Sequence, residues 1–416
     1  MFTSFSTALS ALAASTTAID VVGNNLANLN TPGFKTSIIS FHDLVTQSLG
    51  AGLGDTQVGF GVGTPITLRE FSQGALQTTG GTLDAAIQGD GFFIVQGPNQ
   101  SIEYTRGGNF QVDKSGNLTT ATGEQLQGWT QMVNGQLNTN TPPGNITIPV
   151  GTVQPPSPTK SFSFDINLNA AAVSGTASDT FATSVTIYDS LGNSHVVTAT
   201  FKKDDTTPNK WNYSVSIPDA DVQTPPFPAL TGFLQFKSDG TLDSDNTTDP
   251  EPLVIEGLAD NAADMSINWN LRNSGNPRIT QFAQPSSTSA VSQDGSPAAQ
   301  LVRVAVGDGG QLLAQFSNGQ QTVVGQLAMA TIRNPESLIA VGNSNYQLSA
   351  RSALPAVGVP GTGGRGTVKG GAIEASTVDI ATEFTNLIVY QRGYEANSKV
   401  VSSVDELSQT TINLIK

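Results

Sequence analysis

Cysteine and histidine, two side chains that often carry catalysis or bind transition metals, are nearly absent from this sequence. It contains no cysteine and two histidines, His42 and His195, which lie far apart along the chain. Thiolate chemistry and disulfides are therefore excluded, and a histidine-based metal site or catalytic triad is not expected. We interpret both histidines as structural, with His195 in a strand beside Val196 and Val197.

Two motifs that could bind a ligand stand outside the context that their chemistry requires. Residues 361–366 match G-x-G-x-x-G, but the match neither follows a strand nor opens a helix, so the dinucleotide interpretation fails. An acidic group near residue 245 lacks the glycine and glutamate positions of a calcium-binding EF-hand loop, and we interpret it as an exposed turn. It comprises Asp243, Asp245, Asn246 and Asp249. A carboxylate pair for glycoside hydrolysis stays open, although no pair stands out. We predict no catalytic residue, cofactor or metal.

The stretch from Met1 to Asn30 is the first element that needs an explanation. Its large apolar residues recur every three or four positions, which predicts one narrow stripe along a helix. They are Phe2, Phe5, Leu9, Leu12, Ile19, Val22, Leu26 and Leu29. Asp20 is the one ionisable side chain in the stretch, and small or uncharged residues fill its other faces. Such a helix is expected to need neighbours on several sides, some of them from other subunits.

A second helical pattern runs from Ile373 almost to Lys416, with near-heptad spacing of apolar residues. Its predicted interface residues are Ile380, Phe384, Leu387, Tyr394, Val401, Val404, Leu407 and Leu414. We expect this helix to pair with the first one as a coiled coil. At the end of the first helix, Thr31-Pro32-Gly33 is expected to stop the helical turn, and Phe34 to pack back on it.

Composition describes the rest of the chain as β-rich. Of 416 residues, 12% are charged, 43 are Gly and 22 are Pro, and several stretches alternate apolar with polar residues. The net charge of -14 argues against nucleic acid or an anionic membrane as a partner. No run approaches the roughly 18 apolar residues that span a bilayer. The N-terminus lacks a basic segment, so we expect no cleaved signal peptide and no membrane insertion.

The order of these patterns predicts nested domains, each closed by two segments that are distant in the sequence. We expect a helical terminal domain (1–45 and 372–416) and glycine-rich extended arms (46–70 and 358–371). Inside them we expect an inner β-domain (71–145 and 299–357) and an inserted outer β-domain (146–298), both antiparallel and of sandwich or barrel type. Hinge positions are predicted at Gly50, Gly52, Gly54, Gly59, Gly61 and Gly63.

Three ordered motifs resemble those of the bacterial flagellar rod and hook proteins. The first is Asn-Asn-Leu-Ala-Asn-Leu-Asn-Thr-Pro-Gly-Phe-Lys at 24–35, and the third combines 371–379 with Gln-Arg-Gly-Tyr-Glu-Ala-Asn at 391–397. Between them, 90–93 and 104–118 resemble the β-domain that these proteins share. The family positions carried over are Asn24, Asn25, Asn28, Thr31, Pro32, Gly33, Phe34, Gln391, Arg392, Tyr394 and Asn397. Thr377 departs from the family pattern, which usually has Asn there.

The inserted domain at 146–298 and the run 188–193 make the chain most similar to the hook branch of this family. The resemblance implies a non-enzymatic subunit that polymerises with itself into a curved, flexible tube, a universal joint that transmits motor torque to the filament. It further implies export without a cleavable signal, an extracellular place in the flagellum, and contacts with distal rod, hook cap, hook-filament junction and export proteins. A distal rod protein is one alternative. A secreted β-rich carbohydrate-binding protein is another, from a different class.

Overall fold

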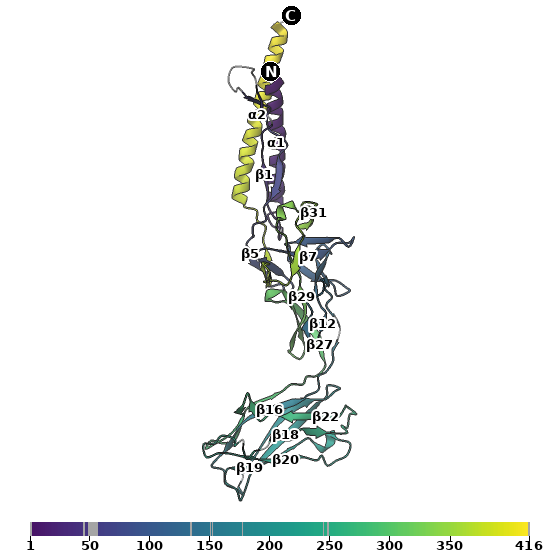
Figure 1. Cartoon of the computed structure of the whole chain (residues 1–416), viewed down its shortest axis with the longest axis vertical. Coiled ribbons are helices and arrows are strands. Elements are labelled where there is room, and N and C mark those ends of the chain that lie inside the picture. The colour runs from purple at the N-terminus through teal and green to yellow at the C-terminus, as the bar shows by residue number, and fades with distance from the viewer. Residues whose placement is uncertain are drawn as a thin grey trace. The chain divides into compact units, whose positions relative to one another are not determined.

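The structure is a computed structural model that describes residues 2–44, 46–48, 57–133, 135–149, 151, 153–176, 178–243, 245–247 and 249–414. Side chains are described for these residues except 2, 3, 46–48, 57, 58 and 414. The chain divides into two compact units (Figure 1). The terminal unit comprises Met1–Val150, Arg303–Gln315 and Gln321–Lys416, and the middle unit comprises Gly151–Val302 and Phe316–Gln320.

Two long helices, α1 (Phe2–Ala27) and α2 (Ile380–Leu414), pack side by side in the terminal unit, as the sequence predicts (Figure 1). Both are shorter than expected. Helix α1 ends three residues before Asn30, and α2 begins at Ile380 rather than Ile373, because Ala372–Glu374 forms a strand. Asp379 starts α2 by accepting a hydrogen bond from the backbone N–H of Thr382 at 2.7 Å, which is N-capping geometry.

The terminal unit contains most of the strands, and an extended antiparallel sheet runs through it in the order β27-β28-β29-β11-β7-β8-β32-β31. Its strands are β1 (Ser37–Ser40), β2 (Thr46–Ser48), β3 (Gln57–Gly59), β4 (Ile66–Arg69), β5 (Leu76–Thr78), β6 (Ala85–Gln88), β7 (Phe92–Gln96), β8 (Ile102–Thr105), β9 (Phe110–Val112), β10 (Leu118–Thr120), β11 (Gln125–Trp129), β12 (Met132–Val133), β13 (Gln136–Leu137), β14 (Gly144–Asn145), β28 (Gln311–Phe316), β29 (Gln321–Leu327), β30 (Met329–Thr331), β31 (Ile339–Gly342), β32 (Asn345–Gln347), β33 (Ala356–Gly358), β34 (Thr367–Gly370) and β35 (Ala372–Glu374). Short 3-10 turns lie at Asp308–Gly310 and Pro335–Ser337. Strand β27 (Ala299–Val306) carries residues of both units.

The core of this sheet is aromatic. Phe92, Tyr104 and Tyr346 are each 3% exposed or less, and the half-buried Phe71 packs edge-on against Phe92 and Tyr346. The register pairs Ile94 with Tyr104, so two core residues face one another across neighbouring strands. The strands and turns predicted near residue 90 therefore belong to a domain with its own buried core, which lies between the two helices in the sequence.

The middle unit is built from two sheets around one core. Its strands are β15 (Val153–Gln154), β16 (Ser161–Asn169), β17 (Thr180–Tyr188), β18 (Ser194–Lys203), β19 (Lys210–Ser216), β20 (Leu230–Gln235), β21 (Leu253–Ile255), β22 (Met265–Trp269), β23 (Arg272–Asn273), β24 (Asn276–Pro277), β25 (Ile279–Phe282) and β26 (Ser287–Gln293), with the 3-10 turn η1 at Asp219–Asp221. One sheet has the order β17-β18-β19-β20, and the other β21-β22-β16-β25 with β26 beside β16. The alternating apolar residues of 162–168, 211–217 and 265–271 are all buried in the core between them.

One detail of the middle unit differs from the sequence-based expectation: β16 runs parallel to both β22 and β25 rather than antiparallel. Of the two predicted types, sandwich or barrel, the two sheets do not form a closed barrel. Parallel pairing is possible because about a hundred residues separate these strands, enough for a crossover connection. Residues 276–299 are rich in Pro, Ser and Gln, and they contain β26. The side chains of this strand are mostly exposed, so its sequence shows no alternation of apolar and polar residues.

The predicted arms are more ordered than expected where the structure describes them. Strand β4 pairs with β1, and β3 with β2, so the segment after α1 folds back as a long antiparallel pair. Residues 358–371 belong to the folded terminal unit, because β33 pairs with β30 and β34 with β6. Gly361, Gly363 and Gly364 have positive φ, which is the conformation of tight turns. The glycines of this segment therefore serve turns in a folded region and do not form a flexible arm. Gly50, Gly52 and Gly54 lie outside the described residues.

Candidate assembly interface

A buried ion cluster joins the terminal segments to the sheet of the terminal unit. Glu374, fully buried on β35, accepts from Lys35 Nζ at 2.6 Å through Oε1 and from Arg106 Nη1 at 3.1 Å through Oε2. Oε1 also accepts from the backbone N–H of Gly74 at 2.8 Å. The second Arg106 nitrogen, Nη2, donates to the Gly89 carbonyl at 2.8 Å. Each charge is thus paired and hydrogen-bonded, which buried charges require.

Lys35 shows the electrostatic balance of this cluster. Its ammonium group donates to Glu374 and, at 2.5 Å, to the Ser72 carbonyl. Burial lowers the pKa of Lys35 below its usual value, and attraction to Glu374 opposes that change. Removing the carboxylate would therefore leave two cations, Lys35 and Arg106, without their shared counter-ion.

A second set of contacts ties the two helices to β1. The Asn25 side chain donates to the Ser37 carbonyl at 2.8 Å and to Glu383 Oε1 at 3.0 Å, and it accepts from the Ser37 backbone N–H at 3.0 Å. Asn25 lies on α1, Ser37 on β1 and Glu383 on α2. Burial raises the pKa of Glu383, because its carboxyl loses contact with water. Next to them, Thr377 Oγ1 accepts from the backbone N–H of Thr36 at 2.9 Å.

We call these residues the junction: Asn25, Lys35, Thr36, Ser37, Arg106, Glu374, Thr377 and Glu383. The three sequence motifs all contribute to it, the first through Lys35, the second through Arg106 and the third through Glu374. The motifs are visible in the sequence, but the meeting of their charged residues is not predicted from it. The sequence does contain one indication of the cluster. Charged residues are scarce in this chain, and each motif contains one of the residues Lys35, Arg106 and Glu374. Thr377, the departure from the family pattern, keeps a hydrogen bond to the opposite segment.

The predicted interface residues do not mainly bury each other within one chain. Small residues make up most of what the single chain buries on α1, with Ala8, Ala14 and Ala18 at most 4% exposed. Among the predicted residues, Val22 is buried, and Leu12, Ile19, Leu26, Leu29, Leu387, Val401 and Val404 are half-buried. Exposed are Phe5, Leu9, Ile380, Phe384, Tyr394 and Leu407. The side chains of Phe2 and Leu414 lie outside the described residues.

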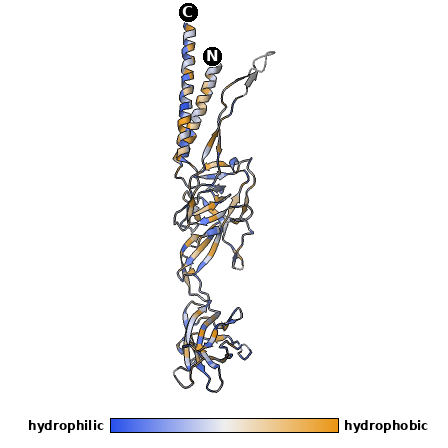
Figure 2. Cartoon of the chain, turned by 90° about the vertical axis from the view of Figure 1, so that its left-hand side faces the viewer, coloured by the Kyte–Doolittle hydropathy of each residue, from blue (hydrophilic) through white to orange (hydrophobic). Residues whose placement is uncertain are grey.

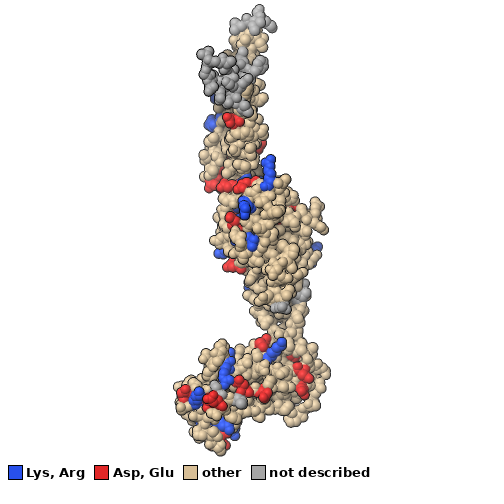
Figure 3. All heavy atoms as spheres, in the orientation of Figure 1, with Lys and Arg blue, Asp and Glu red and all other residues tan. Residues whose placement is uncertain are grey.

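These exposed residues give the helix pair an apolar surface in the single chain. Leu9 is 53% exposed, Phe384 51% and Leu407 59%. Hydrophobic residues, coloured orange, recur along the helices (Figure 2). The side of the terminal unit seen in Figure 3 carries few charged side chains over the described parts of the helices. By length and composition alone, Ser4–Ala27 could even cross a membrane, which corrects the expectation that no such stretch exists. Ala8, Ala14 and Ala18 of this helix are instead buried within the terminal unit.

The remaining family positions are mostly local hydrogen-bonding residues. Asn28 donates to the Asn24 carbonyl at 2.9 Å, and Thr31 donates to Asn28 Oδ1 at 3.1 Å, which closes the turn after α1. On α2, Asn397 donates to the Gly393 carbonyl at 2.9 Å. Other members lie at the surface of α2 or near the junction. Gln391, Arg392 and Tyr394 are on α2, Pro32 is half-buried, and Gly33 and Phe34 are buried.

Two of the predicted hinge glycines are closely packed. A Cβ on Gly61 would lie 2.4 Å from Ser10 Oγ and 3.1 Å from Thr7 Cα, so this glycine lets the β-pair approach α1. The backbone N–H of Val62 donates to Ser10 Oγ at 3.2 Å. A Cβ on Gly63 would clash with the His42 ring. Gly59 has open space around it, and it stays the described position that best fits a hinge.

Gly33 shows how tightly the junction is packed, and it provides a stability prediction. Its φ is +70°, and a Cβ there would lie 2.5 Å from Arg106 C and from Gly107 N. Gly33→Ala is expected to destabilise the terminal unit by about 1–3 kcal/mol or more, because the clash is with backbone that cannot move aside. Gly59→Ala, with nothing within 4 Å, is the matched control and is expected to change little. Urea unfolding measures both; equal stability of the two variants would contradict this packing.

Comparisons with known proteins define the class first. Four family models match in order: flagella basal body rod protein at 5–35, flagellar hook protein FlgE/F/G D1 domain at 86–169, flagellar basal body protein FlaE D2 domain at 167–296, and flagellar basal body rod FlgEFG protein C-terminal at 369–414. They cover most of both helices, the strands of the terminal unit between residues 86 and 150, and most of the middle unit. The chain therefore has the domain composition of a flagellar axial protein.

Full-length relatives then give the family. The chain is 33% identical to the flagellar hook protein FlgE of Salmonella typhimurium, with 99% of this chain and 100% of that protein covered. It is 32% identical to the flagellar hook proteins FlgE of Borreliella burgdorferi (96% of each chain covered) and Escherichia coli (99% of each). The crystal structure of Helicobacter pylori flagellar hook protein FlgE2 shares the fold at a TM-score of 0.51 and 14% identity, covering 70% of this chain and 99% of that one. The chain belongs to the flagellar hook protein family.

Proposed function

We propose that this chain is the subunit that polymerises with itself into the curved, flexible tube of the flagellar hook, where it transmits torque from the motor to the filament. Family membership supports a structural role in the hook. The observation that carries the proposal is the exposed apolar surface of the α1–α2 pair. A stable isolated protein seldom leaves so many large apolar side chains along one helix pair in water, so neighbouring copies are the natural cover.

The junction is the part of the subunit that transmits force within the proposed tube. It connects both helices to β1 and to the sheet of the terminal unit through buried hydrogen bonds and ion pairs, so force on the helices reaches the β-domain through fixed contacts. Flexibility then has to come from other places, and we infer that Gly59 and the neighbouring segment supply it. Export through the flagellar export apparatus, an extracellular place in the hook, and contacts with rod, cap and hook-filament junction proteins follow from the family as parts of the same proposal, as does the absence of catalysis.

Phe384 offers a direct test of the helix surface. Its ring is half exposed on α2, so Phe384→Asp should leave the fold of the single chain intact while placing a charge in the apolar subunit contact. We expect the variant to lose tube formation, because burying an unpaired carboxylate costs several kcal/mol. Negative-stain electron microscopy of concentrated protein measures this directly.

Phe384→Leu is the matched control, because it keeps an apolar side chain at the same position. It is expected to form tubes, although less readily. Normal tubes from Phe384→Asp would show that this face of α2 is not covered in the assembly. Straight rather than curved tubes from the unaltered chain would favour a distal rod role over a hook role.

A further inference from the structure

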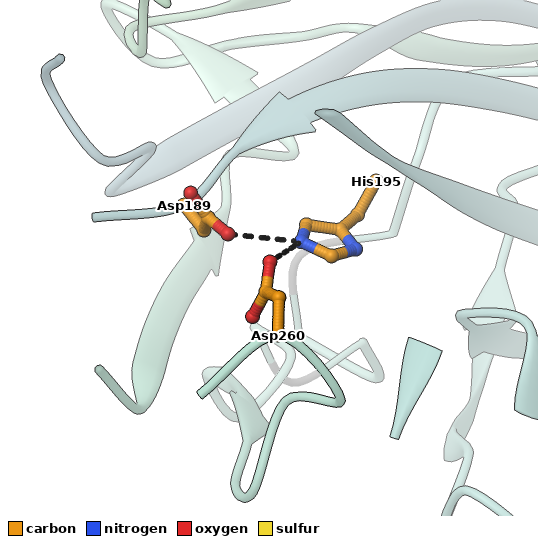
Figure 4. A group of neighbouring side chains, drawn as sticks. All are labelled: Asp189, His195 and Asp260. Carbon is orange, nitrogen blue, oxygen red and sulfur yellow. Dashed lines mark hydrogen bonds and ion pairs between the residues drawn. The ribbon is translucent and has the colours of Figure 1, made fainter. Parts of the chain in front are cut away.

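The middle unit contains a histidine surrounded by three aspartates, which the family comparisons do not explain. His195 lies on β18 with its side chain 8% exposed. Its Nε2 lies 3.3 Å from Asp189 Oδ2 and 3.6 Å from Asp260 Oδ2 (Figure 4). Its Nδ1 lies 3.2 Å from Asp221 Oδ2. The sequence pattern predicts an ordinary strand residue at His195 and gives no sign of this cluster.

Charge balance in the cluster calls for a cation. Three carboxylates meet one imidazole, and Asp189 is completely buried. No lysine or arginine within the described residues forms an ion pair with any of the three. Carboxylates this close to one another and to both ring nitrogens require protons, on the ring or shared between Asp189 and Asp260, or a metal ion between Nε2 and the two carboxylates.

The surroundings hold the two carboxylates facing Nε2 in place. Asp189 Oδ1 accepts from the backbone N–H groups of Leu191 and Asn193, both at 2.8 Å, which leaves Oδ2 directed at the histidine. Asp260 accepts from the Asn193 amide at 2.9 Å and, through Oδ1, from the backbone N–H of Ala262 at 3.0 Å. A preformed set of ligands of this kind does not have to be assembled when an ion enters.

The spacing of the ligand atoms fits a small divalent ion. Ligands about 2.0–2.1 Å from a tetrahedral Zn²⁺ stand roughly 3.3 Å from one another. The candidate ligand atoms of Asp189, His195 and Asp260 lie within 4.8 Å of one another, and two of the three separations are 3.3 and 3.6 Å. Asp221 occupies the position beside Nδ1 where metal-bound histidines usually donate to a carboxylate that fixes the ring.

We propose that Asp189 Oδ2, His195 Nε2 and Asp260 Oδ2 bind a divalent transition metal ion such as Zn²⁺, with Asp221 positioning the ring. One nitrogen and two carboxylate oxygens leave a fourth position for water. The ion would connect the turn after β17, strand β18, the 3-10 turn at Asp219–Asp221 and the loop after β21. It would act as a structural crosslink at one end of the middle unit. This proposal does not depend on the hook function.

Titration of the full chain with Zn²⁺ tests the site, at a protein concentration below assembly and after treatment with EDTA. Isothermal titration calorimetry is expected to show one saturable ion per chain, and Zn²⁺ should raise the melting temperature reversibly. His195→Gln and Asp260→Asn should abolish this binding. Asp221→Asn should weaken it about ten- to a hundredfold, since that residue orients the ligand.

His42→Gln is the matched control, because it removes the other histidine of the chain, which is exposed. It is expected to bind Zn²⁺ as the unaltered chain does. Asp260 is 26% exposed, so Asp260→Asn is the variant expected to fold normally, and circular dichroism in EDTA checks this. Absence of saturable binding by the unaltered chain, or unchanged binding by folded Asp260→Asn, would overturn the metal site and leave protonated histidine as the cation of the cluster.

Discussion

Deletion of Met1–Asn30 is expected to yield a soluble, folded protein that forms no tubes. The deletion removes α1 and with it the exposed apolar residues Phe5 and Leu9. It retains Lys35, Arg106 and Glu374, so the ion cluster that anchors the terminal segments stays complete. Helix α2 loses its main partner within the chain and is expected to become largely unfolded, because helices of this kind depend on packing.

The measurement combines sedimentation velocity with electron microscopy at concentrations where the full chain forms tubes. We expect a single monomer peak and no filaments from the truncated chain, and an unchanged melting transition for the middle unit, which contains none of the deleted residues. The Phe384→Leu chain, with its helix surface conserved, serves as the assembling control. Tubes built by the truncated protein would mean that the β-domains alone carry the subunit contacts, and the proposed role of the helices would be wrong.

The sequence predicts most of the fold because its signals are local. Alternation of large apolar and polar residues locates β16, β19 and β22, and all of the alternating residues are buried. The same rule cannot locate β26, whose side chains are mostly exposed. It cannot locate the parallel partners of β16 either, because pairing between distant strands leaves no trace in a single sequence. The helical prediction is wrong at β35, since Ile373 continues the apolar spacing of α2 by coincidence.

The candidate interface is predictable in its residues but not in its geometry. Spacing of large apolar side chains identifies the stripe on α1, yet the residues of α1 that the single chain buries include the small Ala8, Ala14 and Ala18. Small residues permit close contact, but the spacing of large residues does not show which face of the helix packs against the rest of the same chain.

The junction cannot be predicted from the sequence for a related reason. Lys35, Arg106 and Glu374 are up to 339 positions apart, and only the folded chain brings them together.

Glu374→Gln is expected to have the largest effect of any single substitution in the terminal unit. The glutamine can still accept one hydrogen bond, but it leaves Lys35 and Arg106 buried with no negative charge between them. Breaking a buried ion pair by removing one partner costs about 3–5 kcal/mol. Stability of the terminal unit should fall by that amount, and the strand pairing of β35 with β5 should be the first to exchange its amide protons.

Glu395→Gln is the matched control, because it makes the same chemical change in an exposed ion pair. Arg392 and Glu395 on α2 are 3.0 Å apart, with side chains 78% and 59% exposed, and such surface pairs contribute about 0–1 kcal/mol. Urea unfolding and hydrogen exchange measure the loss of stability in both variants. Because both make the same Glu→Gln change, the difference between them reports the effect of burying the charge. Similar, small losses in both would show that the cluster is not what fixes the helices to the sheet. A large loss confined to Glu374→Gln, together with failure to form tubes, would identify the ion cluster as the coupling between the assembling helices and the β-domain they move.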